Sequence, residues 1–139
     1  MGRHDDETIL PNWTLARGVH ADWIDVDEGG REVVQSRAFD DSNQEVSCFI
    51  LEEVGGVEGF QRNILPVIQR ELGRDLRLAT VEVRIVRSSG RWIYRKPEEF
   101  SGNSAHVVQC PAQHENISRS QFKKEAREIA RLAVLHPSI

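Results

Sequence analysis

The chain has 139 residues, of which 39% are hydrophobic and 29% charged, and its formal net charge is −4. This composition is typical of one soluble globular domain, and no apolar run is long enough for a signal peptide or a membrane span. Two cysteines are too few for a disulfide framework, so we expect buried thiols and a cytoplasmic protein with no membrane contact.

The charges are distributed unevenly along the chain. Residues 1–60 contain 4 Lys or Arg against 14 Asp or Glu, whereas residues 61–139 contain 14 against 8. This asymmetry favours an electrically polar molecule that attracts a partner or a polyanion. The alternative is an ordinary solvated surface, because segments of opposite charge often interleave in space.

Residues 1–12 are predicted to form a flexible N-terminal arm, because the segment starts with a charged run and Pro11 interrupts it. A single domain then spans residues 13–139. Its first strand is expected over 13–20, with Arg17 and His20 near the exit. A short strand over 32–35 follows an acidic stretch that ends in two glycines.

A polar turn over 40–44 separates two short segments that each carry a serine beside an aromatic residue. The apolar run 46–51 after the turn is typical of a buried strand. Ser36 and Ser47 therefore flank the entry to this strand. They serve either as a turn cap and a backbone-bonded hydroxyl or as two hydroxyls that line a site.

These positions carry a resemblance. The chain has Arg17 and His20 in a first strand, Ser36–Phe39 as a Ser-x-Ala-Phe element, Ser47 opening a core strand, and Ala105-His106 before the last helix. In these elements it resembles a family of small uncharacterised bacterial proteins. The resemblance implies a bacterial, intracellular protein and suggests a conflict or toxin–antitoxin type of system, but the family has no established activity.

The next segment predicts a helix over 57–72, with apolar residues at three-and-four spacing. Pro66 should kink this helix or divide it in two, and Gly73 is well placed to end it. Residues 76–96 then read as a β-hairpin around Ser88–Gly90, which would place Arg84 opposite Tyr94.

A last strand is expected over 105–110, followed by a helix over 118–135. Ser118 and Gln121 form a capping box at its start, and the helix has an apolar stripe opposite a basic face. The predicted fold is therefore a single α+β domain. A mostly antiparallel twisted sheet carries the middle helix and the amphipathic C-terminal helix, both on one face.

An enzyme is one alternative for the function. The order of a cation, a strand-opening serine and a distal glutamate resembles the cofactor-binding layout of ADP-ribosyltransferase-like folds, in which cations hold phosphates and a carboxylate holds the ribose. The chain departs from it, since Ser-Thr-Ser and Glu-x-Glu are missing. The candidate residues, with Glu53 as a substitute for Glu52, are Arg17, His20, Ser36, Ser47, Glu52 and His106.

This alternative requires His20, Ser36, Ser47 and His106 to lie within one concave region, where a neutral imidazole near a hydroxyl acts as a base or orients a phosphate. The competing interpretation is that these groups are buried or capping polar side chains. Sequence alone leaves open whether the protein is an enzyme.

Binding of single-stranded nucleic acid is a second alternative. Cations in and beside the hairpin suit phosphates, and its aromatic rings suit unstacked bases. The competing interpretation is that the C-terminal helix covers the rings, and a pI near 5.7 is unusual for a duplex binder. The residues concerned are Arg84, Arg87, Arg91, Trp92, Tyr94, Arg95 and Lys96.

His106, Cys110 and His114 are spaced four residues apart, and thiolate and imidazole groups are zinc ligands. Pro111 interrupts this spacing, however, and no Cys-x-x-Cys accompanies it. We predict no metal and no cofactor. The favoured function is a small intracellular bacterial binding module that recognises a protein partner or a small ligand. The oligomeric state is not indicated.

Overall fold

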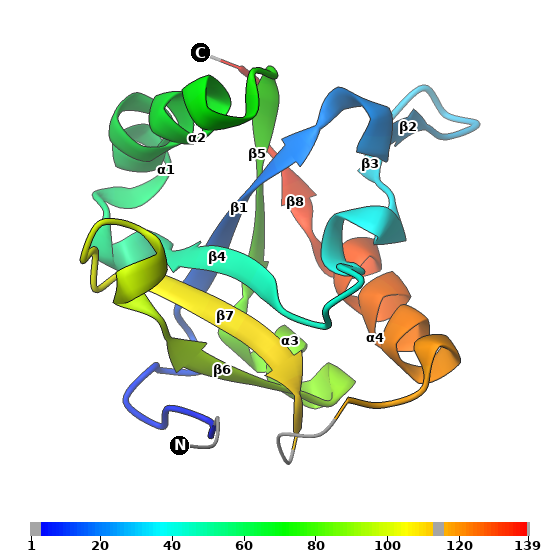
Figure 1. The fold of residues 1–139 in the computed structure, drawn as a ribbon. Helices are drawn as coiled ribbons and strands as arrows, with labels where there is room; N and C mark the ends of the chain where they lie inside the picture. Colours follow the sequence, from blue (N-terminus) through cyan, green and yellow to red (C-terminus); the bar gives the residue numbers. More distant parts are fainter. Residues whose placement is uncertain (1–3, 113–115, 139) are drawn as a thin grey trace.

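The computed structural model describes residues 4–112 and 116–138, and their centre is a six-stranded sheet in the order β6-β7-β4-β1-β5-β8 (Figure 1). All strand pairings of this sheet within the described residues are antiparallel. A separate two-stranded sheet joins β2 (Ile24–Val26) to β3 (Glu32–Val34). The strands of the six-stranded sheet are β1 (Thr14–His20), β4 (Val46–Ile50), β5 (Leu76–Glu82), β6 (Arg91–Arg95), β7 (His106–Pro111) and β8 (Val134–Leu135).

Helices cover both faces of the sheet, so the expectation that they share one face is wrong. Successive residues of a strand point to opposite faces. Ala16 therefore belongs to the cluster under α1 (Gly56–Gly59) and α2 (Leu65–Leu72). Leu15 belongs to the other cluster, with α3 (Val83–Ser89) and α4 (Arg119–Leu132). The α+β prediction itself is confirmed.

The middle helix is divided, as the proline predicts. A π-helical segment, Phe60–Ile64, links α1 to α2, and Pro66 lies in the first turn of α2, where its missing N–H costs little. Gly73 ends α2 with a positive φ of 64°. None of the described helices is long and apolar enough to span a bilayer.

The C-terminal helix begins as the capping box predicts, since the Gln121 N–H donates to Ser118 Oγ over 3.2 Å. It ends at Leu132, before the expected boundary at 135. The reason is that Val134 and Leu135 pair with β5 as strand β8. A tertiary pairing therefore removes the last turn that periodicity predicts.

The predicted hairpin is wrong. β5 and β6 lie in different parts of the sheet, and helix α3 connects them. Arg84 consequently lies on a helix and not opposite Tyr94. The segment fits the spacing of a helix as well as the alternation of a strand, because Val83 and Val86 are three residues apart and both are buried.

Residues 4–12, the described part of the expected arm, lie against the outer edge of β6 (Figure 1). The Asp6 N–H donates to the Ile93 carbonyl over 2.8 Å, and the Ile93 N–H donates to Asp5 Oδ1 over 2.9 Å. Ile9 is fully buried, and Arg87 donates to its carbonyl. These contacts cover an edge strand that would otherwise expose unpaired backbone groups.

Candidate functional site

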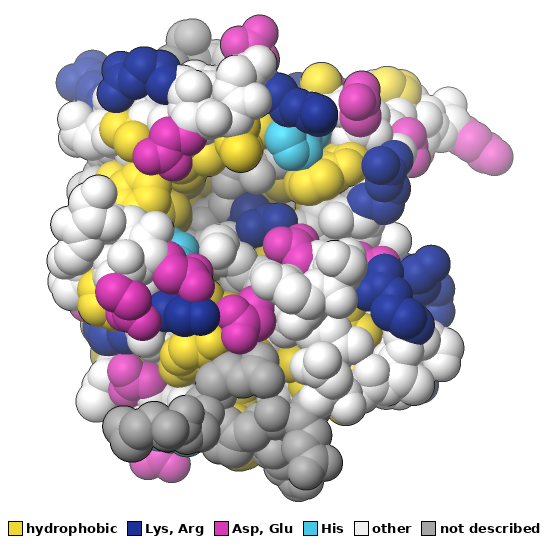
Figure 2. Space-filling view, viewed as in Figure 1, with side chains coloured by type: hydrophobic (Ala, Val, Ile, Leu, Met, Phe, Trp, Pro, Cys, Tyr) yellow, Lys and Arg dark blue, Asp and Glu magenta, His cyan; other side chains and the backbone are white. Residues whose placement is uncertain are grey.

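The candidate site lies where β1 and β4 separate. β1 pairs with β5 over all seven of its residues but with β4 only at Leu15 and Ala16. Beyond Ala16 a hollow of about 840 Å³ opens, and Figure 2 shows this face hollowed, with basic and His side chains around the depression. Its lining residues are Arg17, His20, Trp23, Arg37, Asp40, Asp41, Ser42, Asn43, Arg119 and Lys123.

Arg17 bridges the two separating strands from the floor of the hollow. Its Nε donates to the Ala38 carbonyl over 2.6 Å and its Nη1 to the Ser47 carbonyl over 2.7 Å. Nη2 pairs with Asp41 Oδ1 at 3.0 Å. The guanidinium thus takes the place of a strand ladder, and it retains further N–H groups that can donate to a ligand.

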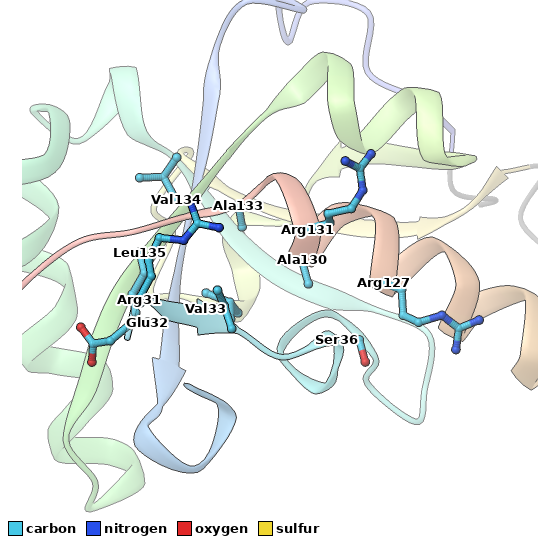
Figure 3. A pocket seen from close by; sticks show the side chains of 11 residues that line it. Arg31, Glu32, Val33, Ser36, Arg127, Ala130, Arg131, Ala133, Val134 and Leu135 are labelled. Atoms are coloured by element: carbon cyan, nitrogen blue, oxygen red, sulfur yellow. The ribbon is translucent and has the colours of Figure 1, made fainter. Parts of the chain in front are cut away.

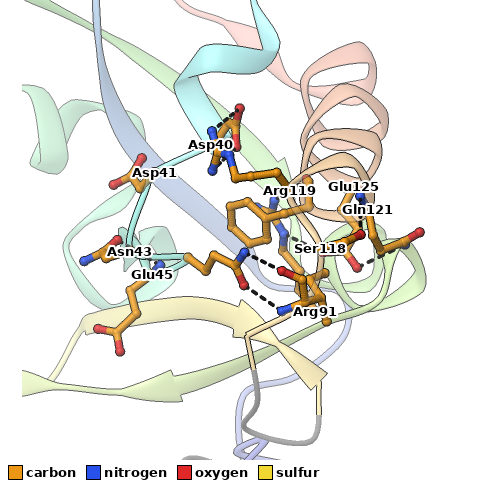
Figure 4. Close-up of polar contacts among 12 residues, drawn as sticks. Asp40, Asp41, Asn43, Glu45, Arg91, Ser118, Arg119, Gln121 and Glu125 are labelled. Atoms are coloured by element: carbon orange, nitrogen blue, oxygen red, sulfur yellow. Dashed lines mark hydrogen bonds and ion pairs between the residues drawn. The ribbon is translucent and has the colours of Figure 1, made fainter.

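A second ion pair joins the turn to α4. Arg119, in the first turn of α4, lies across both carboxylate oxygens of Asp40, at 3.1 Å and 3.2 Å (Figure 4). Asp40 Oδ1 is buried, and its pair with Arg119 Nη1 lacks the angle of a hydrogen bond. The loop is also tied to the segment before α4, since Gln44 exchanges two side-chain hydrogen bonds with the Ile117 backbone.

The hollow carries an excess of positive charge. Asp41 and Asp40 each neutralise one arginine of the lining. Arg37 and Lys123 also line it, and neither side chain has an ion pair or hydrogen bond within the described part of the chain. Two uncompensated cations therefore face a shared hollow in a chain of net charge −4.

His20 stands at the rim with its ring edge-on to Trp23, the ring centroids being 4.3 Å apart. Its Nδ1 is buried and has no hydrogen-bond partner. Burial lowers the pKa of His20 below its ordinary value, and the positive charges of Arg74 and Arg17 lower it further. The imidazole is therefore neutral at neutral pH. An anion nearby would stabilise its protonated form and raise this pKa.

The structure does not bring the other predicted catalytic residues to this hollow. Ser36 lines a separate groove, and Ser47 is exposed on β4. Glu52 accepts the Thr14 N–H over 2.8 Å. His106 is only 3% exposed, and its Nδ1 lies 2.7 Å from the Lys96 carbonyl oxygen.

The ring of His106 also contacts two aromatic side chains. Its centroid lies 5.1 Å from that of Phe49 and 6.2 Å from that of Phe100. His106 is thus a structural residue of the core beneath β7. The expected convergence of His20, Ser36, Ser47 and His106 in one concave region does not occur.

The cations assigned to the hairpin are engaged within the molecule. Each lies in an ion pair with a carboxylate, and Trp92 and Tyr94 are half-buried on β6. Arg91 is the extreme case, because its side chain is fully buried and its guanidinium lies 3.9 Å from the centre of the Phe122 ring. The pairs are Arg84–Glu82, Arg87–Asp5, Arg91–Glu125, Arg95–Glu53 and Lys96–Glu45.

Of the histidine–cysteine motif, His114 lies outside the described residues. Within residues 4–112 and 116–138 no three His, Cys, Asp or Glu side chains gather as a metal site would require. Burial raises the pKa of the Cys48 thiol to about 11, so this thiol is protonated at neutral pH and is not a nucleophile.

Sequence reasoning identified Arg17 and His20 but missed Arg37, Arg119 and Lys123. The usable signal was local, since Arg37 precedes the acidic pair Asp40-Asp41 by only a few residues. Nothing in the sequence links that turn to the start of the last helix. Comparison of the chain with models of protein families, with curated proteins and with solved structures found no match.

Proposed function

We propose that the protein is a binding module for a small anionic ligand, whose phosphate or carboxylate group is held in the hollow at the end of β1. The observation that supports this most strongly is that two cations whose side chains have no partner in the described chain, Arg37 and Lys123, line the same hollow. Like charges that share a concave surface repel each other, and an anion between them relieves this repulsion.

The other lining residues suit the same ligand. Arg17 and Arg119 are held in place by carboxylates, so little side-chain entropy is lost when they donate to an anion. Trp23 supplies an apolar wall beside the cations. A volume of about 840 Å³ falls within the range of small-molecule sites, so the ligand is an organic molecule larger than a phosphate ion.

Binding is favoured over catalysis by the state of His20. Among the described lining residues, no Ser hydroxyl is hydrogen-bonded to its ring, whereas nucleophilic catalysis needs a nucleophile beside its base. Of the predicted functions, the hollow therefore favours a module that binds a small ligand.

Isothermal titration calorimetry with inorganic phosphate at low salt tests the proposal. The double variant Arg37→Ala/Lys123→Ala should bind at least about tenfold more weakly than the native chain, because two charge-assisted contacts are lost. Lys124→Ala is the matched control, since Lys124 is exposed on the same helix but does not line the hollow. Equal weakening by the control, or no binding by the native chain, contradicts the proposal.

A further inference from the structure

A second concave surface, here called the β3 groove, lies between β3, β8 and the C-terminal half of α4 (Figure 3). Its volume is about 720 Å³. Val33, Val34, Ala130 and Ala133 supply much of its apolar lining, and Val134 beside them is 56% exposed. The β3 groove is separate from the hollow, and no residue lines both.

The open edge of β3 faces this groove. The Gln35 N–H donates to the Trp23 carbonyl and the Asp27 N–H to the Arg31 carbonyl, and Asp25 lies opposite Val33 in the same register. In an antiparallel pair, hydrogen-bonded and non-bonded positions alternate. The N–H and C=O groups of Glu32 and Val34 therefore point away from β2.

No strand pairs with β3 on that side within the described chain, because β8 hydrogen-bonds with β5 and β3 only with β2. Unpaired edge groups beside an apolar surface form a template for another strand. A peptide in the groove can exchange backbone hydrogen bonds with Glu32 and Val34 while its alternate side chains contact the apolar lining.

The charges around the groove select the partner. Three arginines line it, of which Arg31 is paired with Asp27 at 3.3 Å and Arg131 with Glu128 at 2.6 Å. The one acid of the lining, Glu32, is paired with Arg77 at 2.7 Å. Arg127 has no partner among the described residues. A second copy of this chain would bring the same cations together, so the charges favour an acidic partner.

We propose that the β3 groove binds an extended segment of a partner protein, in which apolar and acidic residues alternate, as an added strand on β3. The apolar side chains cover the groove lining, and an acidic one pairs with Arg127. This proposal is independent of the anion site, because it rests on other residues.

The probe is a displayed library of random decapeptides, selected against the native chain and counter-selected against Arg127→Glu. Enriched peptides should alternate apolar and acidic residues and bind Arg127→Glu at least about tenfold more weakly than the native chain. Lys124→Glu is the matched control, since Lys124 is exposed on the same helix but lines no part of the groove. Its affinity should equal that of the native chain.

Amide hydrogen exchange supplies the second measurement. Bound peptide should slow exchange at Glu32 and Val34 and leave Val33 unchanged, because Val33 already bonds to β2. The same peptide N-methylated at alternate residues should lose both effects. The proposal is overturned if no peptide is enriched over the variant, if protection appears elsewhere, or if sedimentation shows that the chain dimerises through this groove.

Discussion

Arg17 was singled out by sequence as a phosphate-binding cation, and its position gives it a structural role as well. The guanidinium joins β1 to the loop and to β4 through three hydrogen bonds. Arg17→Ala should therefore lower the free energy of unfolding by about 1.5–3 kcal/mol, because charged hydrogen bonds are lost. Urea denaturation measures this loss. Arg37→Ala, which removes no partnered group, should change stability by less than about 0.5 kcal/mol.

We expect His20 to make anion binding in the hollow dependent on pH. Its pKa is lowered in the free protein, mainly by burial. A bound anion favours the imidazolium and raises that pKa, so the complex takes up a proton that the free protein lacks. Affinity for sulfate, which does not titrate in this range, should rise as pH falls from about 8 to about 5. An unchanged pH profile in His20→Asn would show that another group is responsible.

At the scale of elements, the buried ion pair of Arg91 and Glu125 attaches α4 to the sheet. Arg91 lies 3.2 Å from Glu125 and 3.0 Å from Gln109 Oε1, with its side chain fully buried. Arg91→Met should cost about 3–5 kcal/mol, because Glu125 then stays buried without a cation. Adding Glu125→Leu should restore much of that loss. Equilibrium unfolding of both variants checks this, and additive losses would contradict it.

Gly90 ends α3 with a φ of 115°, directly against α4. A Cβ at this position would lie 2.8 Å from Glu125 Oε2, so Gly90→Ala combines backbone strain with a clash. We expect a loss of more than about 1 kcal/mol in unfolding free energy. Gly73→Ala is the control, since Gly73 also has a positive φ but nothing within 4 Å of the added methyl group. Equal losses would remove the Glu125 contact from the explanation.

The whole molecule pairs its acidic and basic halves. The acids Asp5 and Glu53 from the first half bind Arg87 and Arg95 from the second, and Asp40 binds Arg119. Ion pairs between the two halves therefore neutralise part of the charge asymmetry of the sequence. Among the cations whose side chains have no partner in the described chain, Arg37 and Lys123 line the hollow and Arg127 lines the β3 groove.

Local sequence patterns predicted much of this fold. Pro66, Gly73 and Ser118 act through their own backbone geometry, so their effects were readable without the tertiary structure. The α3 segment was misread because a short run with Val83 and Val86 fits a strand as well as a helix. The apolar alternation could not show which strands become neighbours.

The candidate site was only half predictable for the same reason. Arg17 and His20 lie on one strand and were visible from its pattern. Arg37 and Lys123 line one hollow only because β1 and β4 separate and α4 packs beside the turn. The spacing of residues along the sequence does not show which elements the packing of the fold brings together.

The most direct test of the anion site is a titration of the ¹⁵N-labelled chain with inorganic phosphate, followed by amide chemical shifts. We predict saturable shifts confined to residues around the hollow, such as Arg17, Arg37 and Lys123, and their loss in Arg37→Ala/Lys123→Ala. Shifts in the β3 groove should stay unchanged. Phosphate-induced shifts that are absent, that spread over all exposed basic residues, or that persist in the double variant would contradict the account.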